Sequence, residues 1–294
     1  MREATLGKSG ISSEAEVLDL AEDILGPLTI LADQSPRPRG EKILRVQPRS
    51  GDACLIKWYR DKSSYLRESD ALTLYAPALG SAAPKLIHGD EALRMLLITE
   101  LRGEIVAGGE AEWDPVVHYK AGEVVRRLHE TSQAVISDQF AHHCVSSFEM
   151  NASKIEGLVS AAAVEEVRSH VDRVLDLPPV TLVPAHRDNH PRNWILDSGQ
   201  KVKLHNFATS EYDPWVVDVF PLSQEYWRAD SQLKLAFLSG YDRQLDAQDL
   251  TILKAYHAVM AVSAIAASGR SSGTRLERIR SQDLIDSLLG ITLF

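Results

Sequence analysis

The sequence predicts an α+β fold with a small, mainly antiparallel sheet in its first third and a larger, mainly helical remainder. Three patterns support this prediction. Short strand-like runs separated by turn residues dominate residues 1–101, the apolar period becomes helical from about Trp113, and a polar, irregular segment interrupts the helices over residues 180–220. The chain has 294 residues, 44% of them hydrophobic, which is enough for a sizeable core. We expect two lobes, residues 1–101 and 102–294.

The elements of the first third are marked by their ends as well as by their period. Ser12 or Ser13 can cap a helix with apolar residues at helical spacing, and Gly26-Pro27 ends it. Turn-rich stretches separate the strand-like runs, and Gly89-Asp90-Glu91 reads as the turn between the last two. We expect strands at residues 28–32, 42–46, 53–59, 84–88 and 94–101, and a helix over 65–79.

The remaining two thirds are predominantly helical. Valine, alanine and leucine residues recur at helical spacing up to His129, and again before Pro178-Pro179. The polar segment carries a turn at 197–199 followed by a strand at 202–204. Helices are expected over residues 113–129, 163–175, 226–241, 247–267 and 281–289.

Composition excludes several classes of protein. Two cysteines, Cys54 and Cys144, predict neither a disulfide framework nor a cysteine-rich metal site, and they fit a reducing cytoplasm. No apolar run approaches the roughly 20 residues of a membrane-spanning helix, so we expect no membrane. The net charge is −9, which does not favour a nucleic-acid partner. Residues 101–294 carry −7, which could attract a cationic small molecule or simply aid solubility.

The polar segment carries the residues with the clearest chemistry. A hydrophobic lead-in delivers His186-Arg187-Asp188, and Asn193 follows five residues after the aspartate. A hairpin loop that holds an aspartate and an asparagine suits phosphoryl transfer, because the aspartate accepts the proton of an attacking hydroxyl and the asparagine oxygen ligates Mg²⁺. His186 reads more naturally as a buried support for the loop, and Arg187 and Arg192 either meet phosphate or pair within the loop.

This segment resembles the aminoglycoside phosphotransferase and choline kinase-like family, which is related to the protein kinases. The family's His-x-Asp-x-x-x-x-Asn element is matched by His186, Asp188 and Asn193, and its Ile-Asp-Phe element by His205-Asn206-Phe207. The resemblance implies a bilobal protein-kinase-like fold with ATP and Mg²⁺ as cofactors. It makes Asp188 the catalytic base, supported by His186, with Asn193 and Asn206 at the metal.

The resemblance extends to the nucleotide-binding residues of the first lobe. Lys57, late on a strand, matches the lysine that binds the α- and β-phosphates, and Glu68 on the next helix matches its ion-pair partner. A buried lysine would be costly without such a partner, although a surface position for Glu68 is nearly as plausible. Gly40 belongs to the nucleotide loop, and Glu100-Leu101 to the segment that holds the adenine.

Asn206 is the main departure from the family pattern, because an aspartate is expected there. An amide oxygen can coordinate a cation but brings no negative charge. Either the metal site is weakened, or His205, Glu211 or Asp213 moves in, or the site is inactive. The nucleotide loop is also poor in glycine. His142-His143 lacks further ligands at metal spacing, so we expect a solvated loop there.

Two functions from different classes follow. The leading one is an ATP-dependent O-phosphotransferase acting on a small hydroxylated molecule: an aminoglycoside or other antibiotic, often cationic, or a metabolite such as choline or a sugar. The alternative is a pseudokinase or ligand-binding scaffold, which Asn206 motivates. Phosphorylation of proteins is disfavoured, because little chain separates Phe207 from Asp213.

Overall fold

The computed structural model describes residues 13–35 and 41–268. Contacts between residues group the chain into two compact units. The first extends to Ser132 and also contains His186–Glu211 and Ser231–Asp242, while the second contains Gln133–Ala185, Tyr212–Asp230 and the chain from Arg243 onward. The predicted two-lobe division at residue 101 stays a prediction.

A five-stranded antiparallel sheet with the order β1-β2-β3-β5-β4 forms the first third of the chain and confirms the α+β prediction. Hydrophobic and β-branched residues dominate the central strands, and β3 and β5 are almost entirely buried. The strands are β1 (Leu28–Asp33), β2 (Glu41–Pro48), β3 (Cys54–Tyr59), β4 (Leu86–Asp90) and β5 (Met95–Thr99).

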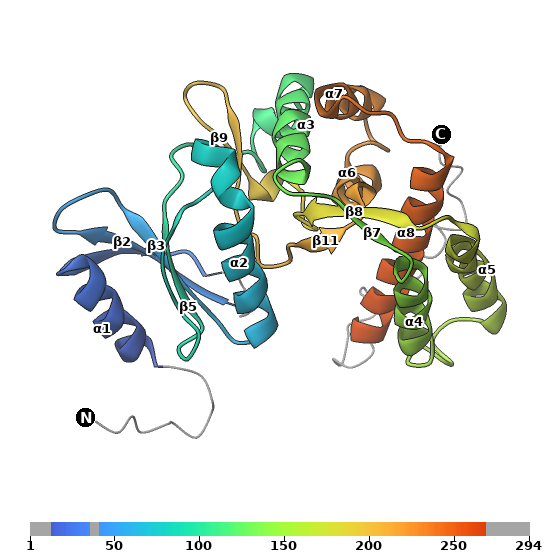
Figure 1. Ribbon diagram of the computed structural model, residues 1–294, viewed down its shortest axis with the longest axis horizontal. Helices are drawn as coiled ribbons and strands as arrows, with labels where there is room; N and C mark the ends of the chain where they lie inside the picture. Colours follow the sequence, from blue (N-terminus) through green and yellow to red (C-terminus); the bar gives the residue numbers. More distant parts are fainter. Residues whose placement is uncertain (1–12, 36–40, 269–294) are drawn as a thin grey trace. The chain divides into compact units, whose positions relative to one another are not determined.

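Helices cover the two faces of this sheet (Figure 1). Helix α1 (Glu14–Leu25) begins at Ser13, whose side chain accepts a hydrogen bond from the Glu16 amide in a capping box, and Gly26 follows its end. Its buried residues pack against one face of the sheet, which includes Ile56 and Trp58 of β3. Helix α2 (Lys62–Leu74) contacts β3, β4 and β5. Because side chains alternate along a strand, Lys57 points away from the α1 face.

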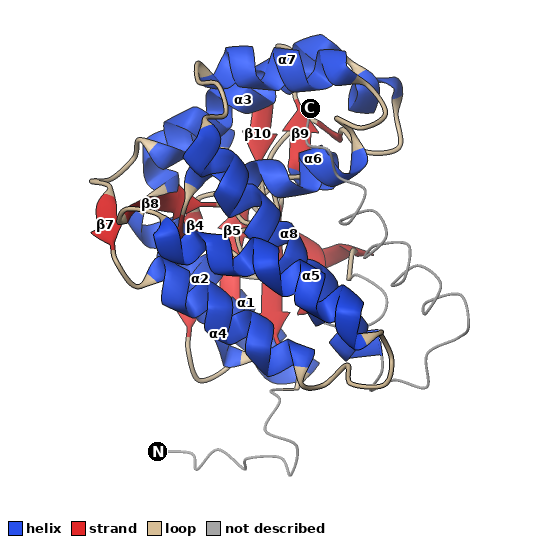
Figure 2. Cartoon of the chain, turned by 90° about the vertical axis from the view of Figure 1, so that its right-hand side faces the viewer, coloured by secondary structure: helices blue, strands red, loops and turns tan. Residues whose placement is uncertain are grey.

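A helix pair and a hairpin complete the first unit (Figure 2). Helices α3 and α7 lie side by side, and a β-carbon on Gly122 or Gly240 would collide with the backbone of the facing helix. Both glycines are therefore required by the close approach. The remaining elements are η1 (Ala76–Ala82), β6 (Glu104–Ile105), η2 (Glu110–Trp113), α3 (Pro115–His129), η4 (Pro191–Asn193), β9 (Trp194–Leu196), β10 (Val202–Leu204) and α7 (Ser231–Tyr241).

The second unit is a helical layer with one small sheet. Helices α4 and α5 pack against α8 around a core that includes Phe148, Val171 and Val262. The sheet has the order β11-β8-β7. Its elements are β7 (Val135–Ser137), α4 (Phe140–Ala152), α5 (Ala161–Asp172), η3 (Arg173–Asp176), β8 (Val180–Ala185), β11 (Glu211–Asp213), η5 (Trp215–Val219), α6 (Phe220–Glu225) and α8 (Ala247–Ser268).

Several predicted boundaries are wrong for local reasons. The helix expected over 65–79 is α2, which starts earlier at the Asp61 cap and gives way to the separate 3₁₀ segment η1, where Pro77 stands. The turn expected at residues 89–91 lies at 91–94, because β4 continues to Asp90. The helix expected from residue 226 begins at Ser231.

One helix of the second unit is missed altogether. His142 and His143 are exposed, as expected, but they stand on helix α4 and not in a loop. The mixed polar composition around them hides the apolar stripe formed by Cys144, Phe148 and Ala152. The helix expected at 281–289 and the nucleotide-loop residue Gly40 lie outside the described residues.

The expectation that no apolar run reaches membrane-spanning length is also wrong. Residues Ala247–Ala267 are long and apolar enough to cross a bilayer by length and composition, and 56% of an 18-residue stretch of this helix is buried within the fold. Scattered polar residues hide this run from a simple reading. Because α8 packs against α4 and α5, its apolar surface is explained by the core of the second unit.

Candidate active site

Lys57 lies at the centre of the sheet. Strand β3 is paired on both sides, and Lys57 stands opposite Ile43 of β2 and Leu96 of β5. The residue is only 3% exposed. An ammonium group in such a position requires a carboxylate partner, because desolvation of an unpaired charge costs several kcal/mol.

Glu68 of α2 supplies that partner. The Lys57 ammonium donates to both carboxylate oxygens of Glu68, at 2.8 and 2.6 Å. Glu68 is fully buried, so the surface position considered for it is wrong. The Tyr59 hydroxyl donates to the same carboxylate at 2.5 Å, and burial together with the Glu68 charge raises the pKa of Tyr59. The carboxylate is thus held from two sides and aims the lysine.

A second carboxylate near Lys57 was not predicted. Glu41 of β2 lies 3.6 Å from the Lys57 ammonium. Burial raises the pKa of Glu41, an effect that Lys57 only partly opposes. The sequence alone carried no signal for it, because Glu41 meets the lysine through the pairing of β2 with β3, in which it stands opposite Tyr59, two residues from Lys57.

The loop after β8 brings Asp188 and Asn193 into direct contact. The short turn η4 begins at His190, whose side chain accepts a hydrogen bond from the Arg192 amide, and it ends at Asn193. The Asn193 amide group donates to both the main-chain oxygen and the carboxylate of Asp188, each at 2.7 Å. Asn193 is 3% exposed, and the Asp188 side chain is 20% exposed.

Two buried aromatic contacts hold this loop in place. The Trp194 indole donates to the Asn189 side-chain oxygen at 2.7 Å, and both residues are fully buried. His186 is also fully buried, packs against the Phe207 ring, and donates from Nε2 to the His205 carbonyl at 2.9 Å. His186 therefore links the two sides of the hairpin, which is a supporting position.

Asn206 joins the loop to the lysine. Its backbone has a φ of 65°, a left-handed conformation that asparagine tolerates better than most residues. Its side-chain oxygen accepts a hydrogen bond from Lys57, and its amide group donates to the Asn193 oxygen, both at 3.3 Å. Hydrogen bonds thus run without interruption from Glu68 through Lys57, Asn206 and Asn193 to Asp188.

Two of the residues considered as replacements for the missing aspartate, His205 and Glu211, are engaged elsewhere. His205 donates from Nε2 to the Arg192 carbonyl at 3.2 Å. Burial, assisted by Lys57, lowers the pKa of His205 to about 4, so it is neutral near pH 7. Glu211 pairs with Arg187 at 2.5 Å and is more than half exposed. Neither side chain contributes charge to the amides of Asn193 and Asn206.

Arg192 pairs within the loop, one of the two arrangements considered for it. Its guanidinium donates to the Asp188 carboxylate at 2.5 Å, and its side chain is 58% exposed. Asp188 therefore has one oxygen bound by Arg192 and the other by Asn193. The exposed arginine is the partner that can leave at little cost, since exposed ion pairs contribute about 1 kcal/mol or less.

The segment expected to hold an adenine is partly described. Glu100 follows β5 directly and forms a two-point ion pair with Arg45 of β2, with distances of 2.6 and 2.9 Å. Leu101 comes next and is half-buried. This ion pair attaches Glu100, and with it the start of the segment, to strand β2.

The arrangement fits the phosphates of a nucleotide better than it fits a metal ion. A fixed lysine beside polar amides is suited to phosphate oxygens. In contrast, the amide oxygens of Asn193 and Asn206 are neutral and already accept hydrogen bonds. Within residues 13–35 and 41–268, no group of three or more histidine, cysteine, aspartate or glutamate side chains could hold a metal ion. Mg²⁺ sites normally include a carboxylate, whereas the two positions expected at the metal offer only amides and the nearby Asp188 carboxylate is held by Arg192 and Asn193, so the donor set for a resident metal is poor.

All of these residues, Lys57, Glu68, His186, Asp188, Asn193 and Asn206, belong to the first unit. The fold thus brings together residues that were predicted separately on strand β3, on helix α2 and in the loop after β8. Glu100 and Leu101, which were also predicted, lie in a different segment, directly after β5.

Comparisons with known proteins identify a family for the chain. The model of the phosphotransferase enzyme family (APH) matches residues 36–261. In a sequence comparison with curated proteins, none matches.

Solved structures share the fold at low sequence identity. APH(2")-IIia in complex with GDP and kanamycin has a TM-score of 0.71 at 10% identity, covering 95% of this chain and all of that one. Macrolide 2'-phosphotransferase MphH from Brachybacterium faecium has a TM-score of 0.65 at 14% identity, covering 92% of this chain and 97% of that one. Amicoumacin kinase hAmiN, in complex with AMP-PNP, Ca²⁺ and Ami, has a TM-score of 0.65 at 16% identity, covering 96% of this chain and 94% of that one. These likenesses confirm the protein-kinase-like fold predicted from the sequence.

Proposed function

Since the chain belongs to the phosphotransferase enzyme family, we propose that it transfers the γ-phosphoryl group of ATP to a hydroxyl group of a small molecule. The observation that supports this most directly is the unbroken hydrogen-bonded path from Glu68 and Lys57 to Asp188. It joins a group that can neutralise phosphate oxygens to a group that can accept a proton.

In the proposed reaction, Asp188 orients the acceptor hydroxyl and takes its proton. The acceptor oxygen forms a bond to the γ-phosphorus, the bond from that phosphorus to the bridging oxygen breaks, and ADP leaves with the electron pair. Arg192 releases one Asp188 oxygen when the acceptor enters, while Asn193 keeps the other oriented. Lys57, aimed by Glu68, neutralises charge on the α- and β-phosphates.

The acceptor we propose is a hydroxylated antibiotic, with a cationic one favoured. The solved structures of similar fold include proteins whose names specify aminoglycosides, macrolides and amicoumacin. Residues 101–294 carry a net charge of −7, which would attract a cation. Choline-like and sugar acceptors remain the metabolite alternative, and a cytoplasmic location follows from the need for ATP.

A screen of acceptors with ATP and with GTP tests the proposal. We expect nucleotide-dependent addition of one phosphoryl group to at least one aminoglycoside, macrolide or related antibiotic, detected by mass spectrometry. Asp188→Asn should lower the rate by about 10³-fold, because a general base contributes 10²–10⁴. Asp19→Asn, on the exposed side of α1, is the matched control and should not change it. Turnover that survives Asp188→Asn would exclude the proposed role of this residue.

Asn206 supports a second candidate, a nucleotide-binding protein without turnover. Both amide oxygens that would ligate Mg²⁺ are engaged in hydrogen bonds within the protein. In this case ATP should raise the melting temperature equally with and without Mg²⁺, and no acceptor should become phosphorylated. Any phosphorylated product that requires Asp188 excludes it.

A further inference from the structure

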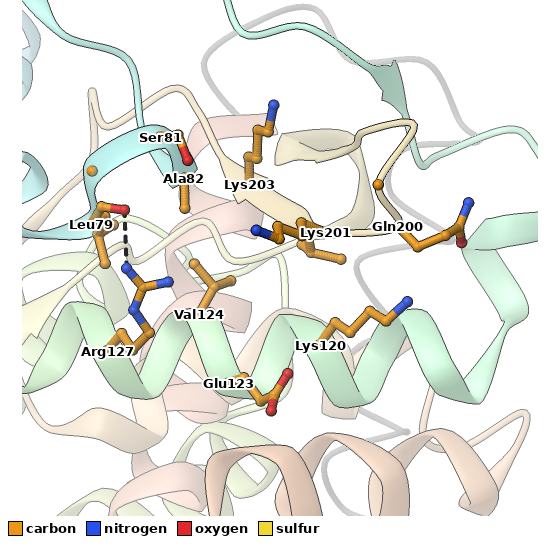
Figure 3. A pocket seen from close by; sticks show the side chains of 13 residues that line it. Leu79, Ser81, Ala82, Lys120, Glu123, Val124, Arg127, Gln200, Lys201 and Lys203 are labelled. Atoms are coloured by element: carbon orange, nitrogen blue, oxygen red, sulfur yellow. Dashed lines mark hydrogen bonds between the residues drawn. The ribbon is translucent and has the colours of Figure 1, made fainter.

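A groove on the first unit lies apart from the candidate active site. Its volume is about 760 Å³, within the size range of small-molecule sites. Helix α3 forms one wall, and η1 and the turn between β9 and β10 form the other (Figure 3). Neither Lys57, Asp188, Asn193 nor Asn206 lines it.

The groove is cationic although the protein is acidic. Lys120 and Arg127 of α3 and Lys201 of the hairpin turn line it, against one carboxylate, Glu123. Across the described part of the chain, none of these three cations forms an ion pair, and Arg127 donates only to the main-chain oxygen of Leu79 at 3.0 Å. In a chain with a net charge of −9, such a concave cationic surface focuses the field on anions.

The carboxylate of Asp197, which contacts the hairpin turn, is already engaged. Asp197 accepts a hydrogen bond from the Lys201 backbone at 2.9 Å and pairs with the Lys203 ammonium at 3.2 Å. These contacts lower the pKa of Asp197, chiefly through the Lys201 backbone. Asp197 therefore fixes the turn that presents Lys201 without neutralising the Lys201 side chain.

The spacing of the cations indicates an elongated ligand. Lys120 and Arg127 are seven residues apart on one face of α3, which corresponds to about 10.5 Å along the axis. In Figure 3 the Lys120 side chain rises from α3, and Lys201 and Gln200 stand above it on the hairpin, while Glu123 lies at the lower edge of the helix. A single phosphate would reach only part of this row of donors.

From this geometry we infer that the groove binds a small linear polyanion, of the oligophosphate class, at a site separate from the one around Asp188. Lys120, Arg127 and Lys201 supply the charge, and Ser81 and Gln200 supply neutral hydrogen-bond donors. Glu123 limits the affinity by repulsion.

Titration with inorganic tripolyphosphate, monitored by calorimetry and by hydrogen–deuterium exchange, tests the inference. Binding should protect residues 79–82 and 199–203 from exchange and weaken with added salt. The triple variant Lys120→Gln, Arg127→Gln, Lys201→Gln should lose at least about tenfold in affinity. Glu123→Gln should tighten binding about twofold, because a repulsive charge is removed.

Arg49→Gln is the matched control, since this exposed arginine does not line the groove, and its affinity should stay at the wild-type value. The single variant Lys201→Gln repeats the test should the triple variant fold poorly. No binding at millimolar tripolyphosphate, or protection confined to residues 186–193, would overturn the inference. Failure of the phosphotransferase screen would leave it untouched, because these readouts require no turnover.

Discussion

The two halves of the candidate active site differ in charge. The strand–helix half, Lys57 and Glu68, is a buried ion pair with both charges held by short hydrogen bonds. The loop half, Asp188, Asn193 and Asn206, contains one carboxylate and two neutral amides. A full charge is thus available where phosphate would bind, whereas the positions expected to hold a metal carry none.

The largest expected effect comes from breaking the charged half. Glu68→Gln leaves the Lys57 ammonium buried, with Glu41, at 3.6 Å, as the one carboxylate that the described residues place beside it. Removal of one partner from a buried pair typically costs 3–5 kcal/mol, and we expect about 3 kcal/mol of lost unfolding free energy here. Urea denaturation measures this loss.

The surface pair between Lys62 and Glu91 is the natural control for that experiment. Both of its side chains are 59% exposed. Glu91→Gln should change the unfolding free energy by less than about 0.5 kcal/mol. Equal effects of the two substitutions would show that Lys57 is not desolvated, which contradicts the contrast between the halves.

The sequence predicted the strand–helix half better than the loop half, for a physical reason. A lysine within an apolar strand is desolvated, so Lys57 requires a nearby carboxylate, and the following helix α2 supplies Glu68. The contacts of Asn206 are different in kind. Its bonds to Lys57 and Asn193 join residues far apart in the chain, and nothing in the sequence fixes their distances.

The same distinction applies to the fold. Helix α1 was predictable because Ser13 and Gly26 mark its ends locally. The pairing of β3 with β5 and the position of Glu41 beside Lys57 depend on sheet register, which is set by many residues together. Helix α4 was missed because its buried stripe is short and interrupted by polar residues.

The next largest effect concerns His205, the residue that precedes Asn206 of the loop half. Burial lowers the pKa of His205 to about 4, against 6.5 as its ordinary value. Between these values the unfolded chain binds the proton and the folded protein does not, so stability falls as the pH falls through this window. His205 alone should lower the unfolding free energy by about 2 kcal/mol between pH 7.5 and pH 5.

His205→Gln should remove that part of the pH dependence. His143→Gln, at an exposed position of α4, should leave the dependence unchanged. His257 in the second unit has its pKa lowered to about 4 as well and contributes its own share in every variant. An unchanged slope in His205→Gln would mean that His205 is not held neutral by the fold.

A smaller effect is expected from restoring a carboxylate to the loop half. Asn206→Asp places a negative charge within reach of Lys57 and gives a dication a charged oxygen. We expect the Mg²⁺ concentration that half-saturates ATP-dependent stabilisation to fall about tenfold, a difference of about 1.4 kcal/mol. Gln133→Glu adds the same charge at an exposed position of the second unit and should have no such effect. An unchanged requirement would show that the metal, where it binds, does not reach position 206.

The smallest effect on stability should come from Arg192, the solvent-exposed partner of Asp188. Arg192→Gln removes the partner of Asp188, but the Arg192 side chain is 58% exposed and Asn193 still holds the carboxylate. We therefore expect a change in unfolding free energy below about 0.5 kcal/mol, measured by urea denaturation. A loss comparable to that of Glu68→Gln would mean that Arg192 is part of the rigid frame of the loop, so that it could not release Asp188 for an incoming hydroxyl. The loop half would then depend on an ion pair as strongly as the strand–helix half does.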